Sequence, residues 1–165
     1  MMNRSVAILL MLGLMPWSGL HAQAQTATTT FKVTTKVSAV CTVTASDLAF
    51  GAYTSSSGSP LQGQTVVSAT CTPGSTYNIG FNDGTGGGTI YGGRKMASGP
   101  SNKLNYQLYR DSARSNIWGN TIGTDTVQDV GTGLIKNHTV FGAIPAAQVV
   151  PAGDYQDVIT VTVSF

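Results

Sequence analysis

The sequence contains no glutamate: all seven acidic residues among its 165 are aspartate. Charged side chains make up only 10% of the chain, and the nine lysines and arginines are scattered along it. Glutamate favours helices, whereas the threonine, valine, serine, glycine and asparagine that are abundant here favour strands and turns. The composition therefore predicts an all-β protein. The scattered, weak positive charge argues against a nucleic-acid-binding surface.

Histidine is nearly absent as well. After residue 24 the only histidine is His138, which lies within a predicted strand, and the chain has no G-x-S-x-G or C-x-x-C motif. This pattern favours a histidine on the face of a sheet over a catalytic one. Asp125 with Asp129, and Asp154 with Asp157, lack an EF-hand or glycosidase context, and we interpret them as solvated turn residues. We expect no enzyme activity, no metal and no cofactor.

Long apolar runs are also missing after residue 24, where none approaches the roughly 20 residues that a membrane helix needs. The first 24 residues have the features of a signal peptide instead. Arg4 is followed by an apolar stretch at 6–14 and by the small-residue sequence A-Q-A at 22–24. We therefore expect residues 1–24 to be removed during export and the mature chain, a single domain, to begin at Gln25.

Cys41 and Cys71 are the only cysteines. An exported protein folds in an oxidising compartment, where two thiols usually pair, so we expect a structural disulfide between them. A metal or redox site would need further ligands or a C-x-x-C spacing.

Alternating apolar residues predict a series of short strands separated by turns. The alternation covers residues 36–44, 48–53, 64–72, 77–81, 104–108, 134–143 and 157–165, with a short piece at 117–118. About seven strands in roughly 120 residues predict a β-sandwich of immunoglobulin-like size. We expect Tyr106 and Trp118 to lie in its core. A sugar-binding platform that uses Trp118, Tyr91 and Tyr109 is the alternative.

The last predicted strand continues to the final residue of the sequence. From residue 158 onward it has no charge, proline or glycine, which are the features with which proteins usually protect an exposed sheet edge. A second alternating stretch, F-K-V-T-T-K-V at 31–37, lies near the other terminus. Such an edge is covered either by another part of the same chain or by a strand added from another chain.

Motifs distributed from Cys41 onward resemble the spore coat protein U family, to which the pilin subunits of archaic (Csu-type) chaperone-usher pili belong. The matching segments are C-T-V at 41–43, F-G-A-Y at 50–53, C-T-P-G at 71–74, L-N-Y-Q-L-Y-R-D at 104–111, W-G at 118–119, V-F-G-A-I-P at 140–145 and P-A-G-D-Y-Q-D at 151–157. Together they cover nearly all of the chain from Cys41 to its end.

The resemblance implies an incomplete immunoglobulin-like β-sandwich that lacks its seventh strand and carries an apolar groove beside the last one. Residues 25–37 would form an N-terminal extension that serves as a donor strand, and residues 38–165 the domain. The implied donor side chains are Phe31, Val33, Thr35 and Val37. The implied acceptor groove, to which a chaperone would also bind, is lined by Ile159, Val161, Val163 and Phe165. Cys41 and Cys71 would form the family disulfide.

The resemblance also implies partners. A periplasmic chaperone would fill the groove first, and an outer-membrane usher would then let the extension of the next pilin subunit replace it. We therefore expect a structural pilin subunit, assembled by donor-strand exchange into an extracellular fimbrium for adhesion and biofilm formation. A protective spore-coat-type protein and a secreted carbohydrate-binding module are the alternatives.

Overall fold

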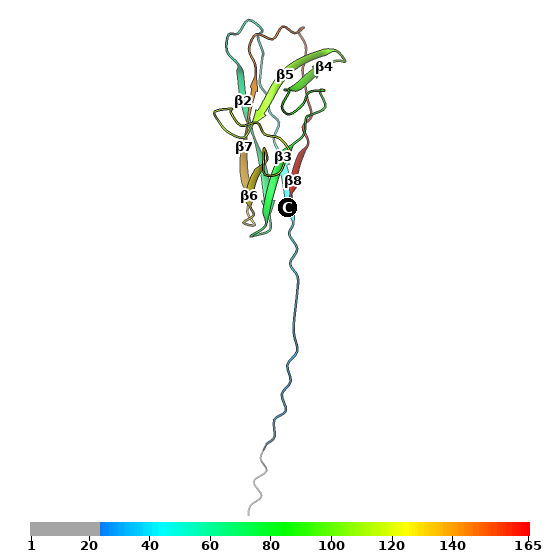
Figure 1. Cartoon of the computed structure of the whole chain (residues 1–165), viewed down its shortest axis with the longest axis vertical. Helices are drawn as coiled ribbons and strands as arrows, with labels where there is room; N and C mark the ends of the chain where they lie inside the picture. Colours follow the sequence, from blue (N-terminus) through cyan, green and yellow to red (C-terminus); the bar gives the residue numbers. More distant parts are fainter. Residues whose placement is uncertain (1–23) are drawn as a thin grey trace, which may run out of the picture. The chain divides into compact units, whose positions relative to one another are not determined.

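The computed structural model describes residues 24–165 (Figure 1), so the predicted signal peptide lies outside the described residues except for Ala24. The chain divides into two units, the first ending at Lys36 and the second running from Val37 to Phe165. Every residue from 24 to 36 is exposed, and none belongs to a helix or strand. All regular structure described below therefore belongs to the second unit.

Eight strands make up the second unit, and residues 24–165 contain no helix. The prediction of an all-β fold is confirmed. In chain order the strands are β1 (Cys41–Ala45), β2 (Leu61–Cys71), β3 (Thr76–Phe81), β4 (Arg94–Ser98), β5 (Asn102–Tyr109), β6 (Val127–Val130), β7 (Lys136–Ile144) and β8 (Val161–Ser164).

The strands form two sheets in which every pairing is antiparallel. One sheet has the order β1-β2-β7-β5-β4, and the other has the order β6-β3-β8. Figure 1 shows β2 and β7 side by side in the first layer and β3 beside β8 in the second. The last strand of the chain is thus an edge strand.

The core lies between the two sheets and follows the alternation that the sequence predicted. Successive inward positions of β2, β3, β5 and β7 are buried, because side chains alternate between the two faces of a strand. The buried apolar residues are Val67, Ala69, Cys71, Tyr77, Ile79, Phe81, Leu104, Tyr106, Leu108, Trp118, Val140 and Ile144.

Trp118 is fully buried in this core, as expected. Its ring stacks on Phe81 with 4.4 Å between the centroids, and its Nε1 donates a hydrogen bond of 2.8 Å to the carbonyl of Ile79. A side chain that is fully buried and satisfied in this way has no face left for a sugar. The structure therefore contradicts a carbohydrate platform built on Trp118.

Strand β4 was missed by the pattern of alternation because one of its inward residues is an arginine. Arg94 is fully buried. Its guanidinium donates to Gln107 Oε1 (2.7 Å) and to the carbonyls of Trp118 (2.8 Å), Asn82 (2.9 Å) and Phe81 (3.2 Å). Burial lowers the pKa of Arg94, and these four acceptors offset the cost of removing its charge from water. Arg94 thereby ties β4 to the end of β3, to β5 and to the loop that contains Trp118.

Three other strand predictions were wrong, two of them in extent and one entirely. Residues 36–40 and 48–53 alternate but are not strands, and the last strand is confined to Val161–Ser164. Strand β6 was also missed, since V-Q-D-V is too short and polar to stand out. The piece at 117–118 is a single bridge between Ile117 and Tyr109. Alternation alone does not make a strand where no neighbouring strand is available for pairing.

The disulfide between Cys41 and Cys71 is present and joins directly opposed residues of β1 and β2. It closes a loop with a sequence separation of 30 residues. In the chain-entropy model a loop of this length stabilises the folded state by about 3.5 kcal/mol. The bond therefore fixes the edge strand β1 to the sheet.

Candidate functional site

The sandwich is open along one side, where an edge of each sheet is free. Strand β1 pairs only with β2, and β8 pairs only with β3, among the strands that the structure describes. These two edge strands approach each other across the sandwich. The segment that follows β1 and the segment that precedes β8 are mostly not paired with a neighbouring strand.

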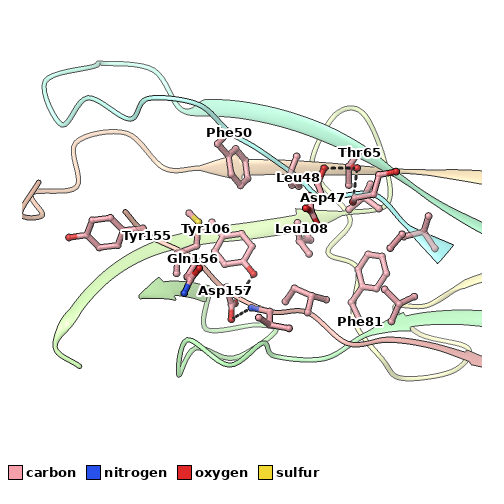
Figure 2. Close-up of a pocket in the computed structure, with 18 residues that line it drawn as sticks. Asp47, Leu48, Phe50, Thr65, Phe81, Tyr106, Leu108, Tyr155, Gln156 and Asp157 are labelled. Carbon is pink, nitrogen blue, oxygen red and sulfur yellow. Dashed lines mark hydrogen bonds between the residues drawn. The ribbon is translucent and has the colours of Figure 1, made fainter. Parts of the chain in front are cut away.

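A groove of about 450 Å³ lies in this opening (Figure 2). Figure 2 shows Leu48 and Phe50 on one side of Tyr106, and Asp157 on the other. Its floor consists of core side chains. The residues that line it come from 45–48 and Phe50, from the inner faces of the strands (Thr65, Val67, Phe81, Met96, Tyr106, Leu108 and Val140), and from 155–159 and Val161.

A second hollow of about 700 Å³ continues the groove toward the other end of the sandwich. The two share Leu48, Phe50, Met96 and Tyr155, so they form one continuous channel. The second hollow lies between residues 48–55 and residues 150–155. The channel therefore runs between two stretches of chain that are extended but are not strands.

The first wall rests on a pair of glycines. Leu48 and Phe50 point inward over Gly63 and Gly142, which are directly opposed in β2 and β7. A Cβ on Gly142 would lie 2.6 Å from Phe50 Cζ and 2.7 Å from Leu48 Cδ2. The absence of side chains there lets this segment lie between the sheets, so Leu48 and Phe50 form the wall of the groove.

The second wall is the C-terminal segment, which passes from one sheet to the other. Gln156 exchanges backbone hydrogen bonds of 2.8 and 3.1 Å with Ala97 of β4. Five residues later Val161 pairs with Phe81 of β3. Between these points Ile159 packs against the core and lines the groove. The wall is thus held at both ends and has an unpaired edge between them.

Asp157 fixes the middle of this second wall. One carboxylate oxygen accepts from the backbone amides of Thr85 (2.7 Å) and Gly86 (2.8 Å), and the other accepts from the hydroxyl of Tyr106 (2.7 Å). Burial and the bond to Asp157 raise the pKa of Tyr106. Asp157 therefore joins three parts of the chain, which makes it a structural anchor and corrects its interpretation as a solvated turn residue.

Asp125 also differs from its interpretation. It is buried, and it accepts hydrogen bonds from the Thr121 amide and the Tyr91 hydroxyl. The hydrogen bond to Asp125 is the main reason that the pKa of Tyr91 is raised. Asp125 thus closes the loop that contains residues 119–125.

His138 lies away from the groove, between the two sheets. Its Nε2 is 3.1 Å from the Tyr77 hydroxyl and 3.8 Å from Asp129 Oδ2, while Lys136 Nζ is 2.6 Å from Asp129 Oδ1. A catalytic triad needs the nucleophile and the carboxylate on opposite ring nitrogens, whereas here both neighbours approach Nε2. Burial lowers the pKa of His138, which favours the neutral ring that can accept from Tyr77.

No group of three or more histidine, cysteine or acidic residues among residues 24–165 is arranged to hold a metal ion. In the same residues the structure has no helix of the length and apolarity that a membrane span requires.

The residues that the resemblance implied as groove side chains are distributed along the second wall. Ile159 and Val161 line the groove, and Val163 packs against the core below it. Phe165 is 60% exposed and lies outside the groove lining. Sequence reasoning missed the opposite wall, although the F-G-A-Y motif that contains Phe50 was a signal for it.

The residues implied as donor side chains are exposed. Phe31, Val33 and Val37 are 86%, 82% and 80% exposed, and Thr35 between them is exposed as well. Large apolar side chains at this exposure have no apolar surroundings of their own. Their alternation places all four on one face of an extended chain.

The fold and the groove define a class of protein: an incomplete immunoglobulin-like β-sandwich of the pilin type, with an open side between two edge strands. Within that class the chain belongs to the Spore Coat Protein U domain family, whose profile matches residues 27–162. It is 34% identical over 158 residues to Protein U of Myxococcus xanthus, a match that covers 87% of this chain and 88% of the relative.

Its fold is also similar to that of a solved structure from archaic chaperone-usher Csu pili of Acinetobacter baumannii, the CsuC-CsuE chaperone-tip adhesion subunit pre-assembly complex. The TM-score is 0.57 at 23% sequence identity, over 78% of this chain. The chain spans 40% of the length of the chain that it matches there.

Proposed function

We propose that this protein is a structural subunit of a surface fibre, in which the groove of one copy receives the N-terminal segment of another. The observation that carries the proposal is the combination of an open apolar groove between two edge strands and an exposed segment with Phe31, Val33 and Val37 on one face. Each feature offers what the other lacks: unpaired edges on one side and unburied apolar side chains on the other.

Backbone hydrogen bonds and apolar burial would both stabilise such a complex. Residues 47–53 of the first wall make no backbone–backbone hydrogen bond with one another or with a neighbour, and β8 has one unpaired edge. An inserted strand could therefore form a ladder, and each bond would contribute about 1 kcal/mol. Burial of each large apolar anchor would contribute about 1.5–3 kcal/mol. These contributions together must exceed the cost of ordering the inserted residues.

The proposal includes partners and a location. The similar structure from Acinetobacter baumannii is a complex between a chaperone and a pilus subunit. By analogy a periplasmic chaperone occupies the groove before assembly, and an outer-membrane usher exchanges it for the segment of a neighbouring pilin subunit. The product is an extracellular fimbrium that serves adhesion and biofilm formation.

The proposal is tested in the strain that makes the protein by replacing residues on the two faces of the segment. Aspartates at Phe31 and Val33 should abolish fibres, because a charged side chain cannot be buried in an apolar groove. Aspartates at Lys32 and Thr34 are the matched control, since these residues alternate with the anchors, and fibres should persist. Normal fibres from the first variant, or loss of fibres from both, would refute the proposal.

A protective coat protein is the second candidate, favoured by the 34% identity to Protein U and by the family to which the chain belongs. The two candidates differ in the genes they require. Chaperone and usher reading frames beside the gene for this protein would favour the fibre, and their absence would favour the coat.

A further inference from the structure

One end of the sandwich carries exposed apolar side chains that the groove does not explain. We call Val40, Val130, Leu134 and Ile135 the pole patch, and these four residues are between 45% and 73% exposed. They lie where β1 and β7 begin and where β6 ends. Clusters of exposed aliphatic residues on a small protein usually mark an interaction surface.

Backbone hydrogen bonds bring the pole patch together around the turn that follows β2. On one side the Thr72 amide donates to the carbonyl of Val40 (2.9 Å). On the other side Gly133 donates to Cys71 (3.0 Å) and Gly131 donates to Ser75 (2.8 Å). The charged side chains nearest to the patch in sequence, Lys136 and Asp129, neutralise each other at 2.6 Å. The two charged side chains next to the patch in sequence are therefore paired with each other.

The length of the chain indicates what covers the pole patch. The proposed donor strand ends at Val37, and β1 begins only four residues later at Cys41. Four residues span at most about 14 Å when fully extended. If Val37 lies in the groove of another copy, the body of that copy must come within this distance of Cys41. The second copy therefore lies against the end that carries the pole patch.

The direction of the donor strand indicates which part of the second copy is involved. All strand pairings in the structure are antiparallel, and β8 runs toward the end that carries the pole patch. A donor strand antiparallel to β8 would leave the acceptor at its opposite end, between the loops 54–60 and 145–153. Val149 in the second of these loops is 92% exposed.

We propose that the pole patch of one subunit packs against the loop end of the next, and that this contact stiffens the junction between them. The inference rests on the proposed function, because it takes the inserted donor strand as the link between the two copies. The donor strand in the groove holds two copies together, and the contact at the pole patch limits how far the junction between them bends.

The test replaces Leu134 and Ile135 with serine in the strain that assembles the fibre. Ile122→Ser is the matched control, because Ile122 is 57% exposed in a loop that contacts the β3 end farther from the patch. Fibres of the double variant should bend more, with a shorter persistence length in electron micrographs, and the control should be unchanged. Where the double variant yields too few fibres to measure, Leu134→Lys alone gives the same measurement.

Two readouts separate this inference from the proposed function. A peptide of residues 26–37 should raise the melting temperature of the purified subunit equally with and without the pole substitutions, because the groove is unchanged. If the peptide stabilises both but the fibres of the double variant remain as stiff as the originals, the pole patch is not a subunit contact. If the peptide stabilises neither, the proposed function itself is wrong.

Discussion

Replacing Asp157 tests how the second wall of the groove is held. In an Asp157→Ala variant the hydroxyl of Tyr106 and the amide of Gly86 lose their acceptor while they remain buried. The amides of Thr85 and Val158 also lose it, but these residues are exposed and can bind water. Hydrogen bonds to a charged group contribute about 1.5–3 kcal/mol each, so the two buried bonds predict a loss of about 3–6 kcal/mol in the free energy of unfolding.

The assay is urea unfolding at constant pH, read from the midpoint with the slope held in common. Asp157→Asn should lose less than Asp157→Ala, because the amide retains one acceptor oxygen. A double-mutant cycle with Tyr106→Phe isolates the bond between the two side chains, and we expect a coupling of about 1–3 kcal/mol. A loss below about 1 kcal/mol for Asp157→Ala, or additive effects in the cycle, would refute the role of Asp157 as the anchor of the wall.

Three further predictions follow from the structure. Gly142→Ala should push Leu48 and Phe50 into the groove, weaken peptide binding and lower the free energy of unfolding by about 1–3 kcal/mol. Gly58→Ala is the control, because a Cβ there meets nothing within 4 Å, and it should change neither peptide binding nor stability. Burial holds the pKa of His138 below its usual 6.5, so the unfolded chain binds more protons and stability should fall as the pH drops through 6.5; His138→Gln should flatten a urea-midpoint profile in that range. Replacing both Cys41 and Cys71 with serine should cost about 3.5 kcal/mol in the same unfolding assay.

Strands with an apolar inner face and a partner on both sides were predictable from the sequence. Residues 77–81 and 104–108 alternate, and they correspond to β3 and to most of β5, with Tyr77 and Leu104 among the buried residues. Strand β4 was not predictable because one of its inward side chains, Arg94, is polar and is satisfied by the distant carbonyls of Phe81 and Trp118. Alternation of apolar and polar residues indicates which side chains of a strand are buried. It does not indicate which distant acceptors will bind a buried cation.

The groove was only half predictable for a related reason. The wall that contains Ile159 and Val161 alternates in a run that is conspicuous in sequence. The opposite wall depends on a glycine pair, Gly63 and Gly142, that becomes opposed only through the register of β2 with β7. Asp157 likewise looks like an ordinary turn residue until the fold brings Tyr106 and the loop at 84–88 to it. Such long-range geometry is not encoded in local pattern.

The melting temperature of the subunit without residues 25–35, measured with and without a peptide of residues 26–37, tests the central claim most directly. A ligand at about 100 times its Kd stabilises a protein by about 2.7 kcal/mol, which for a domain of this size predicts a rise of roughly 10 °C. A peptide with aspartate at the positions of Phe31 and Val33 should produce no rise. An unchanged melting temperature with the native peptide, or an equal rise with both peptides, would contradict the claim that the groove accepts this segment as a strand.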